Sequence, residues 1–332
     1  MTDPDPTDAA PDLHPDDPVA LPRRRPFRFG LQASSAPDAR AWRELARKAE
    51  DLGFATLTVA DHLDDQLATT PALMAAAEAT TTLRIGALVY CNDYHHPVVL
   101  AKEAATLDLL SSGRFEMGLG AGWMTTDYEQ AGIALDPPKL RIDRMTEALA
   151  VIKGLFADGP VTFSGDHYEI RGLEGAPKPV QRPHPPILIG GGGKHVLQVA
   201  GREADIVGLN IRLDQGRIDD SAGPTATRAA TKRKLRWIHE AAGDRYDDLE
   251  LQARIHLVQI TDDRPALAEV IGPAFGLTPA DALECPHALA GSVDEIVEQC
   301  RSRRDDLGIS YIGVGLEAID DIAPVVAALA GT

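Results

Sequence analysis

The amino-acid sequence is poor in positive charge. Its 332 residues include 33 Lys and Arg against 50 Asp and Glu, which gives a formal net charge of −17 at pH 7. Because proteins that bind nucleic acids present basic patches to the phosphates, this balance excludes a nucleic-acid binder. The sequence also has no apolar run approaching the ~18 residues of a membrane helix, and its N-terminus lacks the apolar core of a secretory signal. We therefore expect a cytoplasmic protein that does not bind membranes.

Cysteine is equally scarce. Cys91, Cys285 and Cys300 are far apart and odd in number, so the sequence predicts neither a disulfide framework nor a zinc site. The adjacent His95 and His96 invite a metal hypothesis, but their side chains diverge in an extended segment. No third ligand with suitable spacing is evident, and we predict no metal site.

The first 26 residues differ from the rest in composition. Residues 3–18 are a mixture of Pro, Asp and Ala with almost no large apolar side chains. Such a segment buries too little surface to offset the entropy lost on ordering. Arg23, Arg24 and Arg25 follow, and the acidic residues before them neutralise their charge, which is typical of a solvated linker. We predict a disordered acidic tail over residues 1–26 and a single domain over 27–332.

Within that domain, strand-like runs alternate with helical patterns. Asp38 is a predicted helix cap, and Ser292 with Glu295 has the spacing of a capping box. The eight strand-like runs are 27–32, 55–60, 83–90, 114–119, 186–189, 204–209, 249–260 and 309–314. Two insertions, at about 160–182 with a hairpin and at about 210–231, interrupt the alternation. Eight strands, each followed by a helix, predict an α/β fold of the (β/α)8 TIM-barrel type with insertions.

Chemistry in a TIM barrel lies where strands end, so residues just after each strand are candidates. Asp61 and His62 directly follow the second predicted strand. An imidazole beside a carboxylate at this place is suited to general acid or base catalysis. The alternative is a helix-capping Asp followed by a surface His.

Two glycine clusters follow the fourth and fifth predicted strands, at 118–122 and 190–193. Glycine lets backbone amides approach a flat or anionic ligand, and a helix N-terminus behind them favours phosphate. A dinucleotide site of the Rossmann type is disfavoured, because it needs the motif after the first strand and an acidic residue about 20 positions later, and the sequence has neither. The alternative reading of each cluster is a tight turn without a ligand.

Several ordered motifs together resemble the bacterial luciferase-like superfamily, and the deazaflavin-dependent branch of it most closely. The likeness runs from about Phe27 to the C-terminus. It is carried by Asp61-His62, the segment Gly86 to Asn92 followed by His96-Pro97, the run Leu107 to Arg114, the block Gly118 to Trp123, and Gly190 to Gly193 with Ala200-Gly201-Arg202 and Asp205. The resemblance implies a luciferase-like TIM barrel that binds FMN or coenzyme F420 at the barrel mouth.

Residue by residue, the resemblance implies a site. It sets His62 over the reactive face of the deazaflavin as the catalytic proton donor or acceptor. It implies a cis peptide bond between Leu88 and Val89, behind the ring. The cofactor-binding residues implied in this way are Asp61, Leu88, Val89, Cys91, Ala121, Gly122, Thr126, Gly192, Gly193, His195 and Val196, of which the last four would hold the phosphate.

One position departs from the family pattern. Trp123 stands where sugar-phosphate dehydrogenases of this family have a glutamate that takes part in proton transfer, and tryptophan cannot perform that step. Oxidation of a sugar phosphate is therefore disfavoured. Trp123 is a candidate apolar wall for an organic substrate or else a core residue. Tyr90 and Tyr128 are further candidates for substrate contact, with plain packing as the alternative.

The predicted reaction is hydride transfer between C5 of F420 and a small-molecule or peptide-derived organic substrate, with reduction of an activated C=C or C=N bond. The alternative is an FMN-dependent monooxygenase that works with a separate flavin reductase. A non-catalytic cofactor carrier is a third hypothesis. A homodimer is expected from the resemblance alone.

Overall fold

The structure is a computed structural model that describes residues 18–213, 216 and 220–332. Eight parallel strands form a closed barrel, because β3 pairs with β5 as well as with β2. The strands in chain order are β1 (Arg28–Gln32), β2 (Thr56–Val59), β3 (Arg84–Ala87), β5 (Phe115–Gly120), β8 (Ile187–Gly191), β9 (Ile206–Leu209), β10 (Glu250–Arg254) and β13 (Ile309–Gly315). The short β4 (Tyr90–Cys91) continues the third predicted strand beside β5. The predicted TIM barrel is confirmed.

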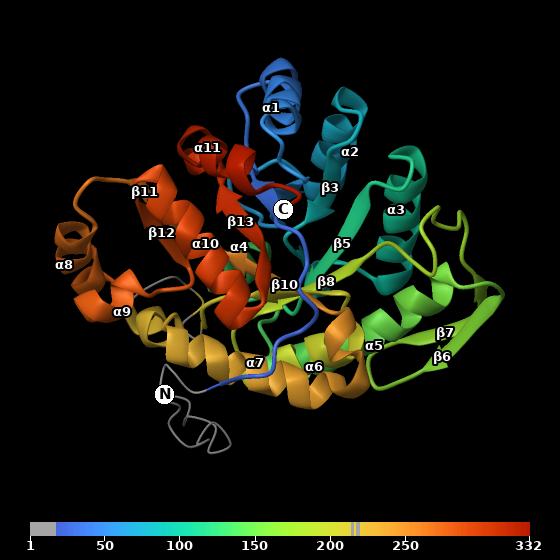
Figure 1. The fold of residues 1–332 in the computed structure, drawn as a ribbon. Coiled ribbons are helices and arrows are strands. Elements are labelled where there is room, and N and C mark those ends of the chain that lie inside the picture. The colour runs from blue at the N-terminus through green and yellow to red at the C-terminus, as the bar shows by residue number, and fades with distance from the viewer. Residues whose placement is uncertain (1–17, 214–215, 217–219) are drawn as a thin grey trace.

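Helices surround the barrel and bury their apolar faces on the outside of the strands (Figure 1). They are α1 (Ala39–Asp51), α2 (Thr69–Ala79), α3 (Pro97–Leu110), α5 (Pro138–Phe156), α6 (Lys194–Glu203), α7 (Arg228–Ala242), α10 (Val293–Leu307) and α11 (Ile319–Leu329). The short α4 (Thr125–Ala131) follows β5 and contributes no residue to this core. Asp38 caps α1 as predicted, since its side chain accepts from Ala41 N at 2.8 Å. The capping box of Ser292 and Glu295 at the start of α10 is also confirmed. Among the described residues, no helix combines the length and apolar character that crossing a membrane requires.

Segments outside the alternation cluster on two sides of the barrel (Figure 1). The predicted hairpin is β6 (Pro160–Ser164) paired with β7 (Glu169–Glu174). The segment 249–260 was predicted as one strand but divides into β10 and β11 (Leu257–Ile260). β11 leaves the barrel to pair in parallel with β12 (Ala288–Gly291), which the sequence analysis did not predict. Between those two strands lie α8 (Arg264–Ala274) and α9 (Pro279–Leu283).

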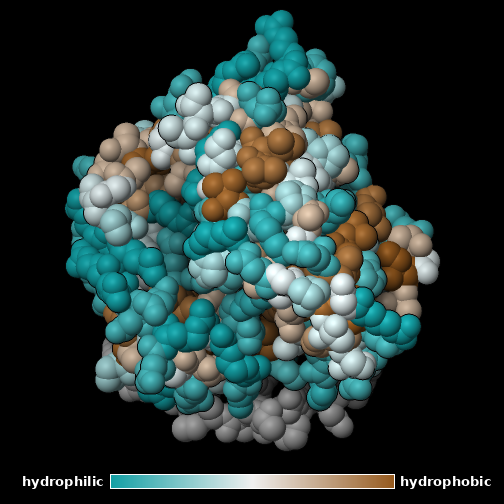
Figure 2. All heavy atoms as spheres, turned by 90° about the vertical axis from the view of Figure 1, so that its right-hand side faces the viewer, coloured by the Kyte–Doolittle hydropathy of each residue, from teal (hydrophilic) through white to brown (hydrophobic). Residues whose placement is uncertain are grey.

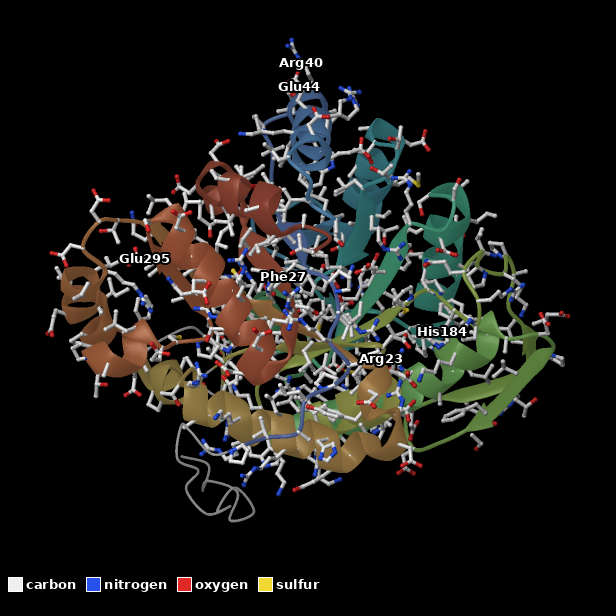
Figure 3. The ribbon with its side chains drawn as sticks, viewed as in Figure 1. Arg23, Phe27, Arg40, Glu44, His184 and Glu295 are labelled. Carbon is white, nitrogen blue, oxygen red and sulfur yellow. The ribbon has the colours of Figure 1, made fainter. Side chains whose placement is uncertain are left out.

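Residues 18–26 differ from the predicted tail. Arg25 donates from Nε to Leu249 O at 3.3 Å, and Tyr246 Oη donates to Ala20 O at 3.0 Å. Pro22 is buried, whereas Arg23 and Arg24 are exposed as a linker would be (Figure 3). The segment therefore packs on the barrel and is not a free linker, because the side chain of Arg25 donates to a backbone carbonyl of the barrel. The rest of the predicted tail, 1–17, lies outside the described residues.

The inner face of the barrel is ionic at its amino-terminal end. Glu116 is 4% exposed and accepts from Arg28 Nη1 at 2.6 Å and from Arg84 Nε at 2.7 Å. Arg28 also pairs with Glu250 at 2.7 Å and lies over the ring of Tyr311 at 3.9 Å. Burial raises the pKa of Glu116, but the charges of Arg28 and Arg84 outweigh it, so the pKa lies below its usual value. Four charges of alternating sign thus close the bottom of the barrel.

Glycines line the middle of the inner face. Gly30 and Gly118 come two residues after the inward-pointing Arg28 and Glu116 and therefore share the inner face with them, and Gly208 and Gly313 lie beside Gln252 of the neighbouring strand β10. A Cβ at Gly30 would lie 2.8 Å from the ring of Tyr311, and one at Gly313 would lie 2.4 Å from Gln252 Nε2. The glycines are therefore needed because large side chains from neighbouring strands occupy the space in front of them.

The face that carries α3 and the β6–β7 hairpin shows hydrophobic patches among hydrophilic residues (Figure 2). Val99, Leu109 and Leu110 of α3 are exposed, at 52%, 46% and 57%. The expected homodimer stays a prediction.

The ionic cluster generates a stability prediction. Glu116→Gln removes the carboxylate of Arg84 and one of the two carboxylates of Arg28, both of which are partly buried, so we expect a loss of about 3 kcal/mol in the free energy of unfolding at pH 7. Because the folded pKa lies below the unfolded value of ~4.3, the contribution is present above that pH and is lost as the pH falls through the folded pKa. Urea unfolding at pH 7 and in acid should therefore show a difference that shrinks in acid.

Glu169→Gln is the matched control, because Glu169 is exposed and pairs with Arg171 at 2.7 Å. Exposed pairs contribute about 0–1 kcal/mol, so this change should be nearly neutral. An equal effect of the two substitutions would contradict the role given to Glu116.

Candidate active site

The residues predicted for the site lie where β2, β3, β5 and β8 end, at the carboxyl end of the barrel. Parallel strands bring these ends to the same side, which is why loops far apart in the sequence meet there. Two histidine–carboxylate pairs form between the loops after β2, β4 and β5.

Asp61 ties two of these loops together. One oxygen, Oδ2, accepts from Cys91 N at 3.0 Å and lies 2.8 Å from His95 Nε2. The other, Oδ1, accepts from Thr69 Oγ1 at 3.1 Å. His95 packs edge-on against the ring of Tyr90, with ring centroids 5.4 Å apart. Asp61 therefore fixes the chain that follows β4, and its predicted contact with the cofactor ring stays a prediction.

His62 forms the second pair. Its Nδ1 lies 2.7 Å from Oδ2 of Asp127, whose side chain is 3% exposed. Leu63 N and Tyr94 Oη also donate to this carboxylate, at 3.4 and 3.3 Å. A carboxylate oxygen at this distance favours the tautomer with the proton on Nδ1, which leaves Nε2 as the nitrogen that faces a ligand. Trp123 lies edge-on to the imidazole with ring centroids 5.4 Å apart, so the structure brings together these two predicted residues.

Asp127 is a residue that the sequence analysis missed. It lies on α4, 65 positions from His62, and no local spacing connects the two. The available signal was its place shortly after the end of β5, where the fold puts functional side chains.

Tyr90 and Tyr128 are both fully buried, at 0% exposure, so the structure does not support their predicted contact with a substrate. Tyr90 Oη bonds to Thr70 Oγ1 at 2.9 Å, and Tyr128 Oη donates to Asp93 Oδ2 at 3.0 Å. Burial raises the pKa of both hydroxyls above the usual value. Their position beside strand ends suggested access, but the loops close over them.

Cys91 is buried beside Tyr128, with Sγ 3.5 Å from the hydroxyl. Burial raises the pKa of this thiol to about 11, so it is neutral and unreactive at physiological pH. Its place near the cofactor stays a prediction.

The peptide bond between Leu88 and Val89 is cis, as the resemblance implied. Leu88 O accepts from Gln32 Nε2 at 3.4 Å. A Cβ at Gly118 or Gly120 would lie 3.2 or 2.5 Å from the side chain of Val89. Val89 therefore projects over glycines of the inner face and forms the floor of the barrel mouth.

The block after β5 is held by a residue that was not predicted. Arg141 of α5 donates from Nη1 to Ala121 O at 2.9 Å and also to Gly122 O. Gly122 has a φ of +78°, and a Cβ there would lie 1.9 Å from Tyr128 Oη, so only glycine fits. Thr126 is exposed in the first turn of α4.

The glycines after β8 leave the start of α6 open. Gly193 is the N-cap of α6 and no side chain caps the helix. A Cβ at Gly193 would meet nothing within 4 Å, whereas one at Gly192 would lie 2.4 Å from Ile211 O. His195 is 44% exposed with Nε2 3.7 Å from Asp143 Oδ1, and Val196 packs over Gly191. The backbone N–H groups here can donate hydrogen bonds to an anion.

Within the described part of the chain, no group of three or more His, Cys, Asp or Glu side chains is placed to hold a metal ion. His96 instead caps α3, with Nδ1 accepting from Val98 N at 3.3 Å.

The chain is similar to several known proteins. The chain is 32% identical over 171 residues to an uncharacterised protein of Mycobacterium tuberculosis, a match that covers 45% of this chain and 59% of that one. It is 29% identical over 294 residues to the F420-dependent glucose-6-phosphate dehydrogenase of Nakamurella multipartita, covering 84% and 82%. It is 27% identical over 218 residues to the FMNH2-dependent dimethylsulfone monooxygenase of Pseudomonas putida, covering 60% of each. The chain thus matches only about three fifths of the length of some of these relatives.

Among solved structures, the F420-dependent tetrahydromethanopterin reductase of Methanopyrus kandleri is similar in fold. The TM-score is 0.72 at 20% identity, and the match covers 92% of this chain and 99% of that one. The family model described as luciferase-like monooxygenase matches residues 25–220, which include β1 to β9 and the His62–Asp127 pair. The chain therefore belongs to the luciferase-like monooxygenase family.

Proposed function

We propose that this protein is an oxidoreductase that uses coenzyme F420 to reduce an activated C=C or C=N bond of an organic substrate. The observation that carries the proposal is the imidazole of His62, held through Nδ1 by the buried carboxylate of Asp127 with Nε2 left for proton transfer. This pair borders the mouth of a barrel whose relatives and structural neighbours include F420-dependent dehydrogenases and reductases.

The residues at the mouth fit a flat ring with an anionic tail. Val89 forms an apolar floor, and the glycines beneath it leave room for the side chain to lie low in the barrel. The open start of α6 at Gly193 supplies backbone N–H groups and the positive end of a helix dipole for a phosphate. Gly192, Gly193, His195 and Val196 are the residues that would hold it.

When bound, F420 would supply a hydride from its C5, because a deazaflavin acts in two-electron steps like a nicotinamide on a flavin-like scaffold. His62 would supply the accompanying proton from Nε2 to the second atom of the reduced bond. Asp127 fixes the ring and stabilises its charged form while the proton moves. The chain's own contribution is therefore orientation and one positioned proton.

Trp123 supports an organic rather than a sugar-phosphate substrate. The indole stands edge-on to His62 and offers an apolar wall beside the proton donor. The indole of Trp123 cannot transfer a proton. We therefore propose a reaction in which His62 is the one acid–base residue.

A second candidate function is an FMN-dependent monooxygenase supplied by a separate reductase. It is favoured by the likeness to the FMNH2-dependent monooxygenase of Pseudomonas putida. The same floor and helix start would serve FMN, which also has a planar ring and a phosphate.

Cofactor titration separates the two candidates. Purified protein is titrated with F420 and FMN, each oxidised and reduced, and dissociation constants are measured by fluorescence. We expect F420 to bind at least tenfold more tightly and to support anaerobic turnover of a panel of enones, imines and dehydroamino acids. Tighter binding of FMN with oxygen consumption would overturn the proposal in favour of the monooxygenase.

His62→Gln tests the proton donor. Losing a positioned general acid costs about 10²- to 10⁴-fold in rate, so we expect kcat to fall by that range while the F420 dissociation constant changes less than threefold. His239→Gln, on the exposed side of α7, is the control and should leave both quantities unchanged. Unimpaired turnover by His62→Gln would remove His62 from the mechanism.

Asp127→Asn tests the positioning of His62. An amide retains the shape but not the charge, so the preference for a proton on Nδ1 weakens and kcat should fall about 100-fold with a shifted pH profile. ¹⁵N NMR of the histidine ring should report the altered tautomer, a change that a purely structural role would not produce. Asp166→Asn, at an exposed turn, is the control; identical spectra for the two variants would contradict this role for Asp127.

A further inference from the structure

Arg254, an arginine at the barrel mouth, has no role in the proposed function. Side chains of β10 alternate between the two faces of the barrel wall: Leu251 and Ala253 are buried toward the helices at 0% exposure. Glu250 points inward, because it pairs with Arg28 at the bottom of the barrel. The alternation puts Arg254 on the inner face at the carboxyl end, where strands carry functional side chains.

Part of the Arg254 guanidinium is committed to the backbone. Nη1 donates to Ile255 O at 2.5 Å and to Gly313 O at 3.4 Å. Nε and Nη2 make no hydrogen bond to the described residues, and no carboxylate of the described part lies within salt-bridge distance. The edge formed by Nε–H and Nη2–H is one that binds both oxygens of a carboxylate. A half-buried cation therefore presents an unused two-point donor.

The groups around Arg254 do not neutralise it. His256 bonds to Asn210 Oδ1 at 2.8 Å, and burial together with the charge of Arg254 lowers its pKa to about 4, so it is neutral. Lys234 is buried behind Asn210 and donates to the carbonyls of Asn210 and Thr225 at 2.6 and 2.8 Å. The carboxylate whose charge acts most strongly on Arg254 is that of Glu317, an exposed residue whose side chain lies in front of Gly315.

Arg254 and His62 border the same mouth from different sides. In the order of strands around the barrel, β10 is separated from β2 by β13 and β1. A substrate fixed at Arg254 by one end can therefore extend across the floor formed by Val89 toward the imidazole.

We propose that Arg254 binds an anionic group of the substrate, a carboxylate in the first place, and so selects unsaturated acids over their neutral counterparts. The inference rests on the proposed function and deepens it by naming the substrate class. Its structural basis is the Nε–Nη2 edge on the inner face of β10, which has no hydrogen-bond partner among the described residues and lies at the mouth that His62 borders.

The test uses acrylate and acrylamide, a matched pair of small probes that differ in charge and fit any larger substrate pocket. Full-length protein labelled with ¹⁵N-arginine is titrated with each, and the Nε–H signal missing from Arg254→Met identifies Arg254. We expect acrylate to shift this signal at concentrations that leave the signal of exposed Arg171 in place, and acrylamide to leave it unchanged. Equal responses to both probes, or no response to acrylate, would overturn the proposal.

A second arm separates the substrate from the cofactor as the source of the anion. Arg254→Met should bind F420 within threefold of the wild type, and in the acceptor panel its kcat/KM ratio of acid to matching amide should fall at least tenfold. A tenfold loss of F420 affinity without loss of acid preference would assign Arg254 to the cofactor and overturn the proposal. If the wild type binds no F420 but acrylate still shifts Arg254, the proposed function fails while the anion site stands.

Discussion

Space inside the barrel is the constraint on which the site depends. Eight strands enclose room for few side chains, and this chain gives up that room at Gly30, Gly118 and Gly313 so that large neighbours can enter. Val89 lies in front of Gly118 and Gly120 and therefore forms the floor of the mouth. At the amino-terminal end the barrel is closed by paired charges, and at the carboxyl end His62 and Trp123 lie side by side. The glycine lining thus decides both how the barrel packs and how deep a ligand can reach.

The two histidine–carboxylate pairs have the same residue types but different surroundings, and we therefore give them different roles. Both carboxylate oxygens of Asp61 have hydrogen-bond partners, which are Cys91 N, His95 and Thr69. The Asp61–His95 pair therefore holds two loops together. Asp127 is buried and holds Nδ1 of His62, whose other nitrogen is left for exchange. Asp61 and His62 follow β2, whereas Asp127 lies on α4 and His95 lies in the loop after β4. The difference between the two pairs comes from the neighbours that each carboxylate contacts, which depend on the packing of these segments and not on the residue type.

Local features were predictable from the sequence because local physics sets them. The strand positions, the cap at Asp38 and the hairpin at β6–β7 follow from hydrophobic period and turn chemistry. The cis bond at Leu88–Val89 came from the family resemblance. Asp127 and Arg141 could not be found in that way, because each acts on a partner distant in the sequence and only tertiary packing brings them together. The same holds for the division of 249–260, where pairing with β12 overrides a continuous strand pattern.

The charge of the whole chain bears on how the mouth must work. A net charge of −17 repels anions at long range, but at physiological salt this field is screened over a Debye length of roughly 8 Å. Recognition of an anionic tail or a carboxylate must therefore come from contacts made inside the mouth, where screening is weak. The open start of α6 and the Nε–Nη2 edge of Arg254, to which no described residue is hydrogen-bonded, are two such places, and they lie at the ends of different strands of the barrel. An acidic surface around such donor groups penalises anions that lack a specific contact, so selectivity among anions follows from the same surface charges.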